Sequence, residues 1–127
     1  MTSSEIIQKH PNLFGQPPFN PRETLIGFGF ECSKHWLPTL ANLFDELDTY
    51  VAEKYPQSEP PFRVQQVKEK FGSLCVYTSF SDDTIRDLIR KAEKEVSSIC
   101  ETCGNPGKLV NDKGWYTVAC TTCLKRN

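Results

Sequence analysis

Residues 100–123 read CETCGNPGKLVNDKGWYTVACTTC and carry two Cys-x-x-Cys pairs separated by sixteen residues. Cys100, Cys103, Cys120 and Cys123 thus follow a spacing that is typical of sites in which four thiolates bind one zinc ion. Two cysteines separated by two residues can face one ion if the backbone turns sharply between them. Gly104 permits such a turn, because glycine tolerates positive φ. The spacing therefore predicts a zinc ribbon with one structural Zn²⁺.

The residues between the two pairs predict a β-hairpin. Residues 108–110 and 115–118 favour strands, and residues 111–114 favour the turn that brings the second pair back to the first. A redox role for either pair would need a thioredoxin-like βαβ context, which this spacing does not favour. A closed shell of four thiolates leaves no position for a metal-bound water. The predicted ion therefore braces the chain and does not hydrolyse a substrate.

The chain is long enough for one domain with a small appended module. It has 127 residues, of which 38% are apolar, so it can bury a modest core. Small domains bury a lower fraction of their surface than large ones and gain from an added brace. We expect an α+β body over residues 1–99 and a zinc ribbon over residues 100–127, docked on that body.

Two amphipathic helices are predicted in the body. In residues 36–55 apolar side chains recur at three- and four-residue spacing, and Pro56 ends the helix. A second such stripe runs over residues 85–99 and follows Ser81-Asp82-Asp83, a stretch suited to cap the helix. Before them, residues 3–9 favour one or two helical turns, and the Pro- and Gly-rich residues 15–23 favour an irregular surface segment.

Residues 62–80, between the two helices, predict a β-hairpin. Phe62, Val64 and Val67 precede a turn near residues 71–73, and Leu74, Val76 and Tyr77 follow it. The alternation of apolar and polar residues is imperfect, so it does not fix the register. The expected architecture is two main helices packed on a small antiparallel sheet, with the zinc ribbon at the C-terminus.

The charge distribution disfavours general binding to nucleic acid. Residues 1–62 hold four Lys or Arg and eight Asp or Glu, and residues 63–127 hold eleven and eight, which gives balances of −4 and +3. Four thiolates around one dication add −2 to the second half, which leaves about +1. No basic stripe remains that would form an obvious phosphate footprint.

We expect the protein to reside in the cytoplasm. No apolar run approaches membrane-spanning length, and residues 1–10, MTSSEIIQKH, lack the basic and apolar regions of a secretory signal. Cysteines stay reduced in that compartment, which favours a metal ion over disulfides for the paired cysteines. No membrane partner is expected.

The remaining cysteines and the histidines give little support to catalysis. Cys32 and His35 have the spacing of half a metal site but no second half, so a buried thiol and an exposed imidazole are expected. We expect Cys75 to lie in the core, and His10, at a helix end, to have no special role. No nucleophile is paired with a base, so the protein is not expected to be an enzyme.

Gly27-Phe28-Gly29-Phe30 is a further motif that invites a functional interpretation. It is similar to the start of a phosphate-binding loop but lacks the remaining glycine and a clear strand-to-helix context. A short strand or a closely packed turn is expected there.

Several motifs together resemble a group of small uncharacterised proteins frequent in bacteriophages and prophages. These motifs are QVKEKFGSLCVY at 66–77, CETCGNPGKL at 100–109, GWYTVAC at 114–120 and GFGFECSKHW at 27–36. The chain departs from the group's pattern at residues 33–35, where the group usually has Gly-Asp-Gly, and at Cys75, where Arg is frequent. The resemblance covers residues 5–124. It implies a phage accessory protein and no particular reaction.

A ligand site is predicted at the end of the first hairpin. KEKFG, residues 68–72, combines two ammonium groups, an aromatic ring and a glycine, which together suit an anionic small ligand or an acidic protein surface. The candidate ligand-binding residues are Lys68, Lys70 and Phe71, with Trp36 and Trp115 included if the fold brings them near. The alternative is that KEKFG is a solvated hairpin end that discourages edge pairing.

Two function hypotheses follow from these features. The first is a non-catalytic binder that neutralises a host component in counter-defence, by sequestering an anionic ligand such as a nucleotide signal or by blocking a host protein. The second is a nucleic-acid-binding or transcription-modulating zinc ribbon. It rests on the four basic residues in or beside the module, which are Lys108, Lys113, Lys125 and Arg126.

Overall fold

The structure is a computed structural model that describes residues 1–126. Its helices are α1 (Ser3–Lys9), α2 (Pro11–Phe14), α3 (Leu37–Lys54), α4 (Asp83–Val96) and α5 (Thr121–Arg126), with two 3₁₀ turns, η1 (Ile26–Phe28) and η2 (Lys34–Trp36). Its strands are β1 (Val64–Lys70), β2 (Ser73–Thr78), β3 (Lys108–Asp112) and β4 (Trp115–Ala119). The fold is α+β with two antiparallel hairpins, as expected from the sequence.

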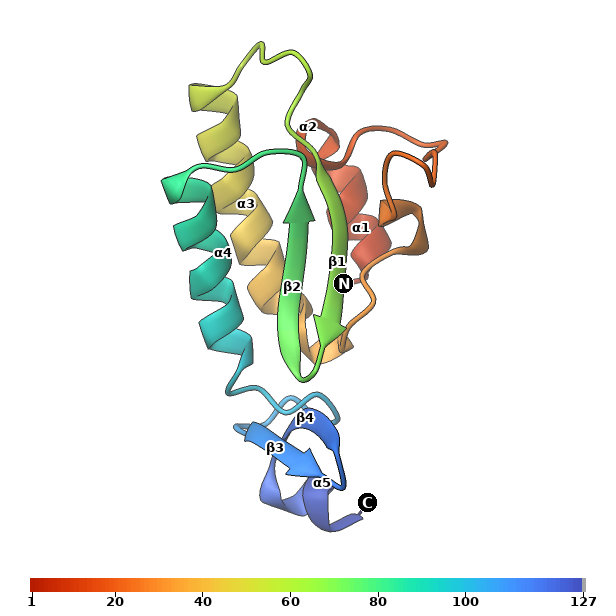
Figure 1. The fold of residues 1–127 in the computed structure, drawn as a ribbon, viewed down its shortest axis with the longest axis vertical. Coiled ribbons are helices and arrows are strands. Elements are labelled where there is room, and N and C mark those ends of the chain that lie inside the picture. The colour runs from red at the N-terminus through yellow and green to blue at the C-terminus, as the bar shows by residue number, and fades with distance from the viewer. Residues whose placement is uncertain (127) are drawn as a thin grey trace.

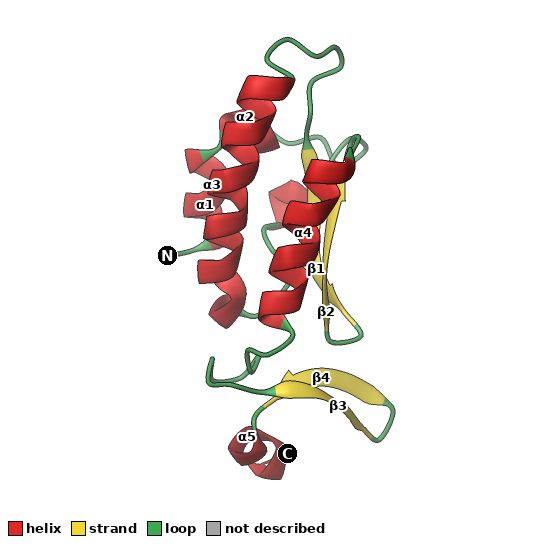
Figure 2. Cartoon of the chain, turned by 90° about the vertical axis from the view of Figure 1, so that its left-hand side faces the viewer, coloured by secondary structure: helices red, strands yellow, loops and turns green. Residues whose placement is uncertain are grey.

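The body has two layers, formed by the β1–β2 hairpin and by the helices. Figure 2 shows the strands edge-on, with α1, α3 and α4 on one side of them. The C-terminal module, defined here as residues 100–126, lies below the body beyond the turn of the hairpin (Figure 1). No described helix is both long enough and apolar enough to cross a membrane.

Helix α3 forms where the sequence predicts it and supplies much of the core. Pro38 lies in its first turn, where a missing N–H leaves no hydrogen bond unmade, and Pro56 follows its end. The apolar stripe is buried, and the Phe44 ring packs edge-on against Phe14 with 5.0 Å between the ring centroids. The buried stripe consists of Leu37, Leu40, Leu43, Phe44, Leu47 and Val51.

The β1–β2 hairpin turns through Phe71 and Gly72, whose φ angles are 54° and 79°. A two-residue loop with both φ values positive matches the twist of the flanking strands. Val67 and Leu74 are buried against the helices. A register shift between Val64 and Gln66 explains why the alternation along β1 is imperfect, since a bulge moves later side chains to the other face.

Residues 25–31 cover the outer edge of β1, which the sequence did not indicate. The Glu31 N–H donates to the Val67 carbonyl at 2.9 Å, and the Glu69 N–H donates to the Glu31 carbonyl at 3.0 Å. The Leu25 N–H donates to the Gln65 carbonyl at 2.8 Å. Helix α4 contacts β2 and lies on the side of β2 away from β1 (Figure 1). Both edges of the small sheet are therefore covered.

Helix α4 is capped by Asp82, one of the three residues, 81–83, from which the sequence predicted the cap. One carboxylate oxygen accepts from the Ile85 N–H at 2.8 Å, and the other accepts from the hydroxyls of Tyr50 at 2.5 Å and Tyr55 at 2.6 Å. Burial acts to raise the pKa of Asp82, but these hydrogen bonds outweigh it and leave the pKa below its usual value. The hydrogen bond to Asp82 raises the pKa of Tyr55 to about 12. The cap thus ties α4 to the end of α3.

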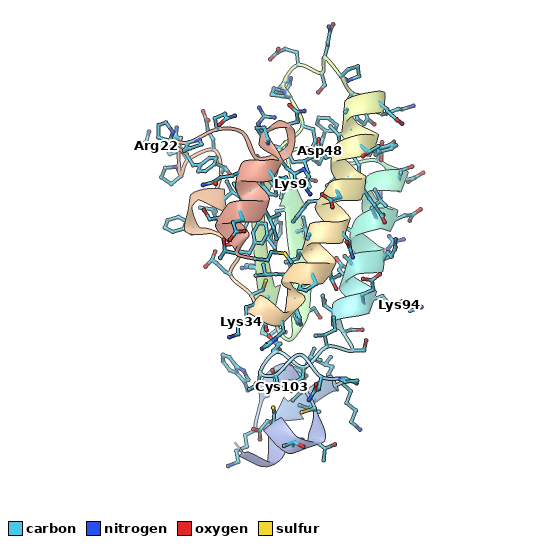
Figure 3. The ribbon with its side chains drawn as sticks, turned by 180° about the vertical axis from the view of Figure 1, so that it is seen from behind. Lys9, Arg22, Lys34, Asp48, Lys94 and Cys103 are labelled. Atoms are coloured by element: carbon cyan, nitrogen blue, oxygen red, sulfur yellow. The ribbon has the colours of Figure 1, made fainter. Side chains whose placement is uncertain are left out.

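His10 is buried between α1 and α3, so the expectation that it has no special role is wrong. Its Nδ1 lies 2.6 Å from Asp48 Oδ2 and its Nε2 lies 3.0 Å from Asp45 Oδ1. Lys9 Nζ lies 3.1 Å from the same Asp45 oxygen. Figure 3 shows Lys9 and Asp48 where α1 faces α3. The pair of carboxylates on α3 therefore holds the N-terminal helix on the body.

Candidate metal centre

The four predicted cysteines come together in the C-terminal module. The sulfur atoms of Cys100, Cys103, Cys120 and Cys123 all lie within 4.8 Å of one another, and the cluster can hold a metal ion. Cys103 Sγ lies 3.6 Å from Cys120 Sγ, and all six cysteines of the chain are free thiols. Cys100 and Cys123 are buried, which limits access of water to the cluster.

Two tight turns place the two cysteine pairs. In the first, the Gly104 N–H donates to the Cys100 carbonyl at 2.9 Å, and Gly104 has φ 81°. That φ favours glycine over other residues, as expected from the sequence. In the second, the Cys123 N–H points at Cys120 Sγ at 3.4 Å as α5 begins. Such N–H groups stabilise sulfur in its anionic form, which is the form that binds a metal.

The β3–β4 hairpin connects the two turns as predicted. Its register pairs Lys108 with Ala119 and Asp112 with Trp115. Lys113 and Gly114 form the two-residue loop, and the Gly114 N–H donates to Asn111 Oδ1 at 2.8 Å. The hairpin therefore closes the sixteen-residue gap and returns Cys120 to the first pair.

The electrostatics of the cluster favour an added cation. Burial acts to raise the pKa of the Cys100 thiol, but hydrogen bonds from surrounding backbone N–H groups lower it to about 6. Hydrogen bonds with Cys120 and Cys103 raise the pKa of Cys123 to about 12. Four thiolates this close repel one another, and a dication at their centre removes that repulsion. A closed four-sulfur shell suits a structural role.

The segment that holds Cys32 and His35 docks the module onto the body. Ser33 Oγ donates to the Glu101 carbonyl at 2.5 Å, and Trp36 Nε1 donates at 3.2 Å to the carbonyl of Ile99, the residue just before the module. The His35 ring packs on Gly104, where a Cβ atom would lie 2.8 Å from Nδ1. His35 is therefore half-buried against the first cysteine turn and not exposed as expected.

Cys32 is half-buried beside this contact, and its role as half of a metal site finds no support among the described residues. Burial raises the pKa of its thiol to about 11, and the carboxylates of Glu101 and Glu69 raise it further. A thiol with this pKa stays protonated at neutral pH and is a poor nucleophile and metal ligand.

The turn of the β1–β2 hairpin makes a second contact with the module. Any Cβ added at Gly72 would overlap the Leu109 side chain of β3. The rings of Phe71 and Tyr116 meet edge to face, with 6.5 Å between centroids. The contacted hairpin is itself held to the first cysteine turn, because Glu101 Oε2 accepts from Thr117 Oγ1 at 2.7 Å and from the Val118 N–H at 2.8 Å. The Phe71-Gly72 end of the KEKFG motif therefore contacts the C-terminal module, while other parts of the motif remain exposed to solvent.

The structure brings some of the predicted ligand-binding residues together and separates others. Lys68 and Lys70 lie on the face of β1 opposite to the buried Val67, and Lys70 Nζ lies 5.9 Å from the centre of the Phe71 ring. Phe71 is 69% exposed. Trp36 is 0% exposed, so its inclusion in a surface site is a correction to the sequence analysis. It serves as a core residue because its whole indole is enclosed.

Trp115 is 72% exposed and stands at the far end of β4, next to the β3–β4 turn. Adjacent residues on a strand point to opposite faces, so its indole faces away from the side that Tyr116 turns toward Phe71. No described contact joins Trp115 to Lys68 or Lys70, and it stays a separate exposed aromatic.

Two residues on the same face as the lysines were missed in the sequence analysis. We call this surface the open face; it consists of Gln66, Lys68, Lys70, Cys75 and Tyr77, on the side of β1–β2 away from the helices. Tyr77 is 42% exposed and pairs with Gln66, and Cys75 pairs with Lys68. Cys75 is thus half-buried on the open face and not in the core. With the register known, strand alternation would have found both.

Comparisons of the chain with models of protein families, with curated proteins and with solved structures gave no match. The site is therefore interpreted from its own geometry.

Proposed function

We propose that the protein is a non-catalytic binding protein in which a structural Zn²⁺ braces the C-terminal module. In this proposal the open face, together with Phe71, binds an anionic ligand. The observation that carries the proposal is the pair of ammonium groups on Lys68 and Lys70, because neither is used in an ion pair among the described residues. Two unpaired cations beside exposed rings suit a phosphate attached to an aromatic group.

The conformation of Phe71 supports this proposal. Phe71 has φ 54°, a left-handed conformation that costs a residue other than glycine about 1 kcal/mol. Asparagine is the usual residue at this position of such a turn. The ring is largely exposed, so the core gains little from it. The Phe71 ring packs edge-to-face on Tyr116 and is otherwise largely exposed, so most of its surface is open to a ligand.

Zinc is the metal that suits the cluster best. Four cysteine thiolates form the tetrahedral sulfur shell that structural zinc prefers, and hard cations such as Mg²⁺ and Ca²⁺ prefer oxygen. The ion would hold the module, and through it Tyr116, against the turn that carries Phe71. In this proposal the zinc fixes the shape of the site and does not contact the ligand.

We propose a setting for this binding from the resemblance to bacteriophage proteins. The ligand would be a component of the bacterial host, and the protein would act in the host cytoplasm, where thiols stay reduced. Sequestering a nucleotide signal suits an exposed ring flanked by two ammonium groups. Blocking an acidic surface of a host defence protein would use the same groups.

Calorimetric titration with a panel of nucleotides, together with capture of partners from host lysate, tests the proposal. The double variant Lys68→Ala/Lys70→Ala should lose binding by at least about tenfold, because each charged contact contributes about 1.5–3 kcal/mol. Lys94→Ala is the matched control, since Lys94 is exposed on α4, away from the open face (Figure 3). Equal binding by both variants, or no binding to any nucleotide or host protein, would reject the site.

Binding to single-stranded nucleic acid is the second candidate. The exposed rings of Tyr77 and Phe71 beside two lysines could stack on bases while the lysines contact phosphates. The side chains of Lys125 and Arg126 lie outside the described residues, and Lys108 and Lys113 are exposed on the second hairpin. Affinity for an oligonucleotide that falls steeply with salt would favour this candidate over a mononucleotide ligand.

A further inference from the structure

A cavity of about 650 Å³ lies between α1 and the segment over residues 15–29. This volume is within the range of about 300–1,000 Å³ that is usual for small-molecule sites. Figure 1 shows α1 and the orange loop beside it on the side of the hairpin away from α4. The C-terminal module and the open-face lysines contribute nothing to its lining. The cavity is thus separate from the proposed anion site.

The cavity lining is mixed polar and apolar and carries no charged side chain. Four side chains offer donors and acceptors: Ser3, Ser4 and Gln8 from α1, and Gln16 from the loop. The hydrogen bonds among the described residues leave these four side chains unused. The lining residues themselves offer a phosphate no cation. Arg63 lies behind Gly15, with Nε 3.2 Å from where a Cβ would stand, and its Nη1 already donates to the Asn12 and Phe62 carbonyls.

Two aromatic rings complete the lining. Phe19 packs partly against the core, whereas Phe28 is 70% exposed and lies on η1. Phe30, two residues later, packs on Phe14 with 5.9 Å between ring centroids. The local turn therefore places the Phe30 ring against the core and leaves the Phe28 ring, two residues earlier, on the cavity. Phe28 contributes little to folding, so its ring face is available to a ligand.

We propose that this cavity binds an uncharged nucleoside. The base would stack on Phe28, and the amides of Gln8 and Gln16 would pair with its edge, since each amide offers a donor and an acceptor side by side. The hydroxyls of Ser3 and Ser4 would contact the ribose. A neutral lining favours a ligand without phosphate, because an unpaired phosphate would lose its hydration without gaining a cation.

Titration of adenosine, guanosine, cytidine and uridine into the whole ¹⁵N-labelled protein, followed by NMR, tests this proposal. At least one nucleoside should shift the amides of residues 3–9 and 15–29 with a Kd of about 1 mM or tighter, and its 5′-monophosphate should bind this cavity no more tightly. Phe28→Ala should weaken the binding by about tenfold, since stacking on one ring contributes about 1–3 kcal/mol per base. The fold should be unchanged, because Phe28 is exposed.

Phe71→Asn is the matched control, because Phe71 is exposed to nearly the same extent, and asparagine tolerates its left-handed backbone. It should leave nucleoside binding unchanged, and so should Lys68→Ala/Lys70→Ala, which is expected to remove binding at the open face. The proposals for the cavity and for the open face can therefore be disproved independently. Shifts confined to other residues, equal binding by Phe28→Ala, no shift at millimolar nucleoside, or equal binding of glucose would each overturn the proposal.

Discussion

At the scale of single residues, Asp82 carries several interactions at once. Its carboxylate caps α4 and accepts from Tyr50 and Tyr55, which lie near the end of α3. The hydrogen bonds keep the pKa of Asp82 below its usual value. As pH falls, the unfolded chain therefore binds this proton before the folded chain does. The stabilisation is present above the unfolded pKa of about 3.9 and is lost as pH falls through the folded pKa.

We predict that the double variant Tyr50→Phe/Tyr55→Phe is less stable than the parent by about 1–3 kcal/mol at pH 7, because a charged acceptor loses two donors. The difference should shrink as pH falls through the folded pKa of Asp82, which lies below its usual value, because a protonated carboxyl is a weaker acceptor than a carboxylate. Urea unfolding over a series of pH values from neutral downward measures it. Comparing two proteins that share the cysteine cluster cancels the effect of acid on metal binding. A difference that stays constant with pH would show that the hydroxyls do not act through the carboxylate.

The residues that were predicted correctly are those whose signal is local. The cysteine cluster follows from spacing, and the cap at Asp82 follows from its place before an apolar stripe. His10 and Trp36 were missed because their partners are distant in sequence: the carboxylates of Asp45 and Asp48 for one, the Ile99 carbonyl for the other. Nothing in a single sequence fixes such long-range pairs.

At the scale of elements, the two hairpins can be compared directly, because each turns through two residues with positive φ. The second residue is Gly72 in one hairpin and Gly114 in the other, with φ 79° and 88°. A Cβ at Gly114 would meet nothing within 4 Å, whereas one at Gly72 would overlap Leu109. An alanine at Gly114 therefore measures backbone strain alone. An alanine at Gly72 measures the same strain plus the overlap with Leu109 of the module.

We predict that Gly114→Ala lowers the free energy of unfolding by about 1 kcal/mol, which is the strain of a left-handed alanine. Gly72→Ala should lower it by about 2–4 kcal/mol, because the overlap adds an overpacking cost of about 1–3 kcal/mol. Thermal or urea unfolding of the metal-loaded proteins measures both. Adding Leu109→Ala should make Gly72→Ala less damaging than it is alone. If both substitutions lowered the free energy of unfolding equally, the packing of the β1–β2 turn on Leu109 would contribute nothing to stability.

The elements themselves were largely predictable, since α3, α4 and both hairpins follow from periodicity and turn residues. The register of β1–β2 was not, because the shift between Val64 and Gln66 breaks the alternation that would reveal it. The pairing of residues 25–31 with β1 was also missed. That segment is rich in glycine and makes single backbone contacts, which leave no repeating pattern in the sequence.

At the scale of the whole molecule, the body and the C-terminal module have separate sources of stability. The body has a continuous apolar core, to which the module contributes Val118. The module offers two buried cysteines and a short hairpin with exposed side chains, so a bound ion would supply most of its stability. The contacts between them include Ser33 and His35 on one side, and Phe71 with Gly72 on the other.

We predict that the purified protein binds one Zn²⁺ per chain and that removing it unfolds the module while the body stays folded. A chelator should lower the melting temperature and move the amide signals of residues 100–124 into the narrow range of an unfolded chain, while those of α3 and β1 keep their positions. Cys103→Ser should reproduce this state and Cys75→Ser should not, since Cys75 lies on the open face, outside the cluster. If the chelated protein kept its module signals, or if Cys75→Ser lost the metal as well, the four clustered cysteines would not be the ligands. If the body unfolded too, the module and the body would form one cooperative unit. The contacts at Ser33, His35 and Gly72 would then contribute more to the free energy of folding than their number implies.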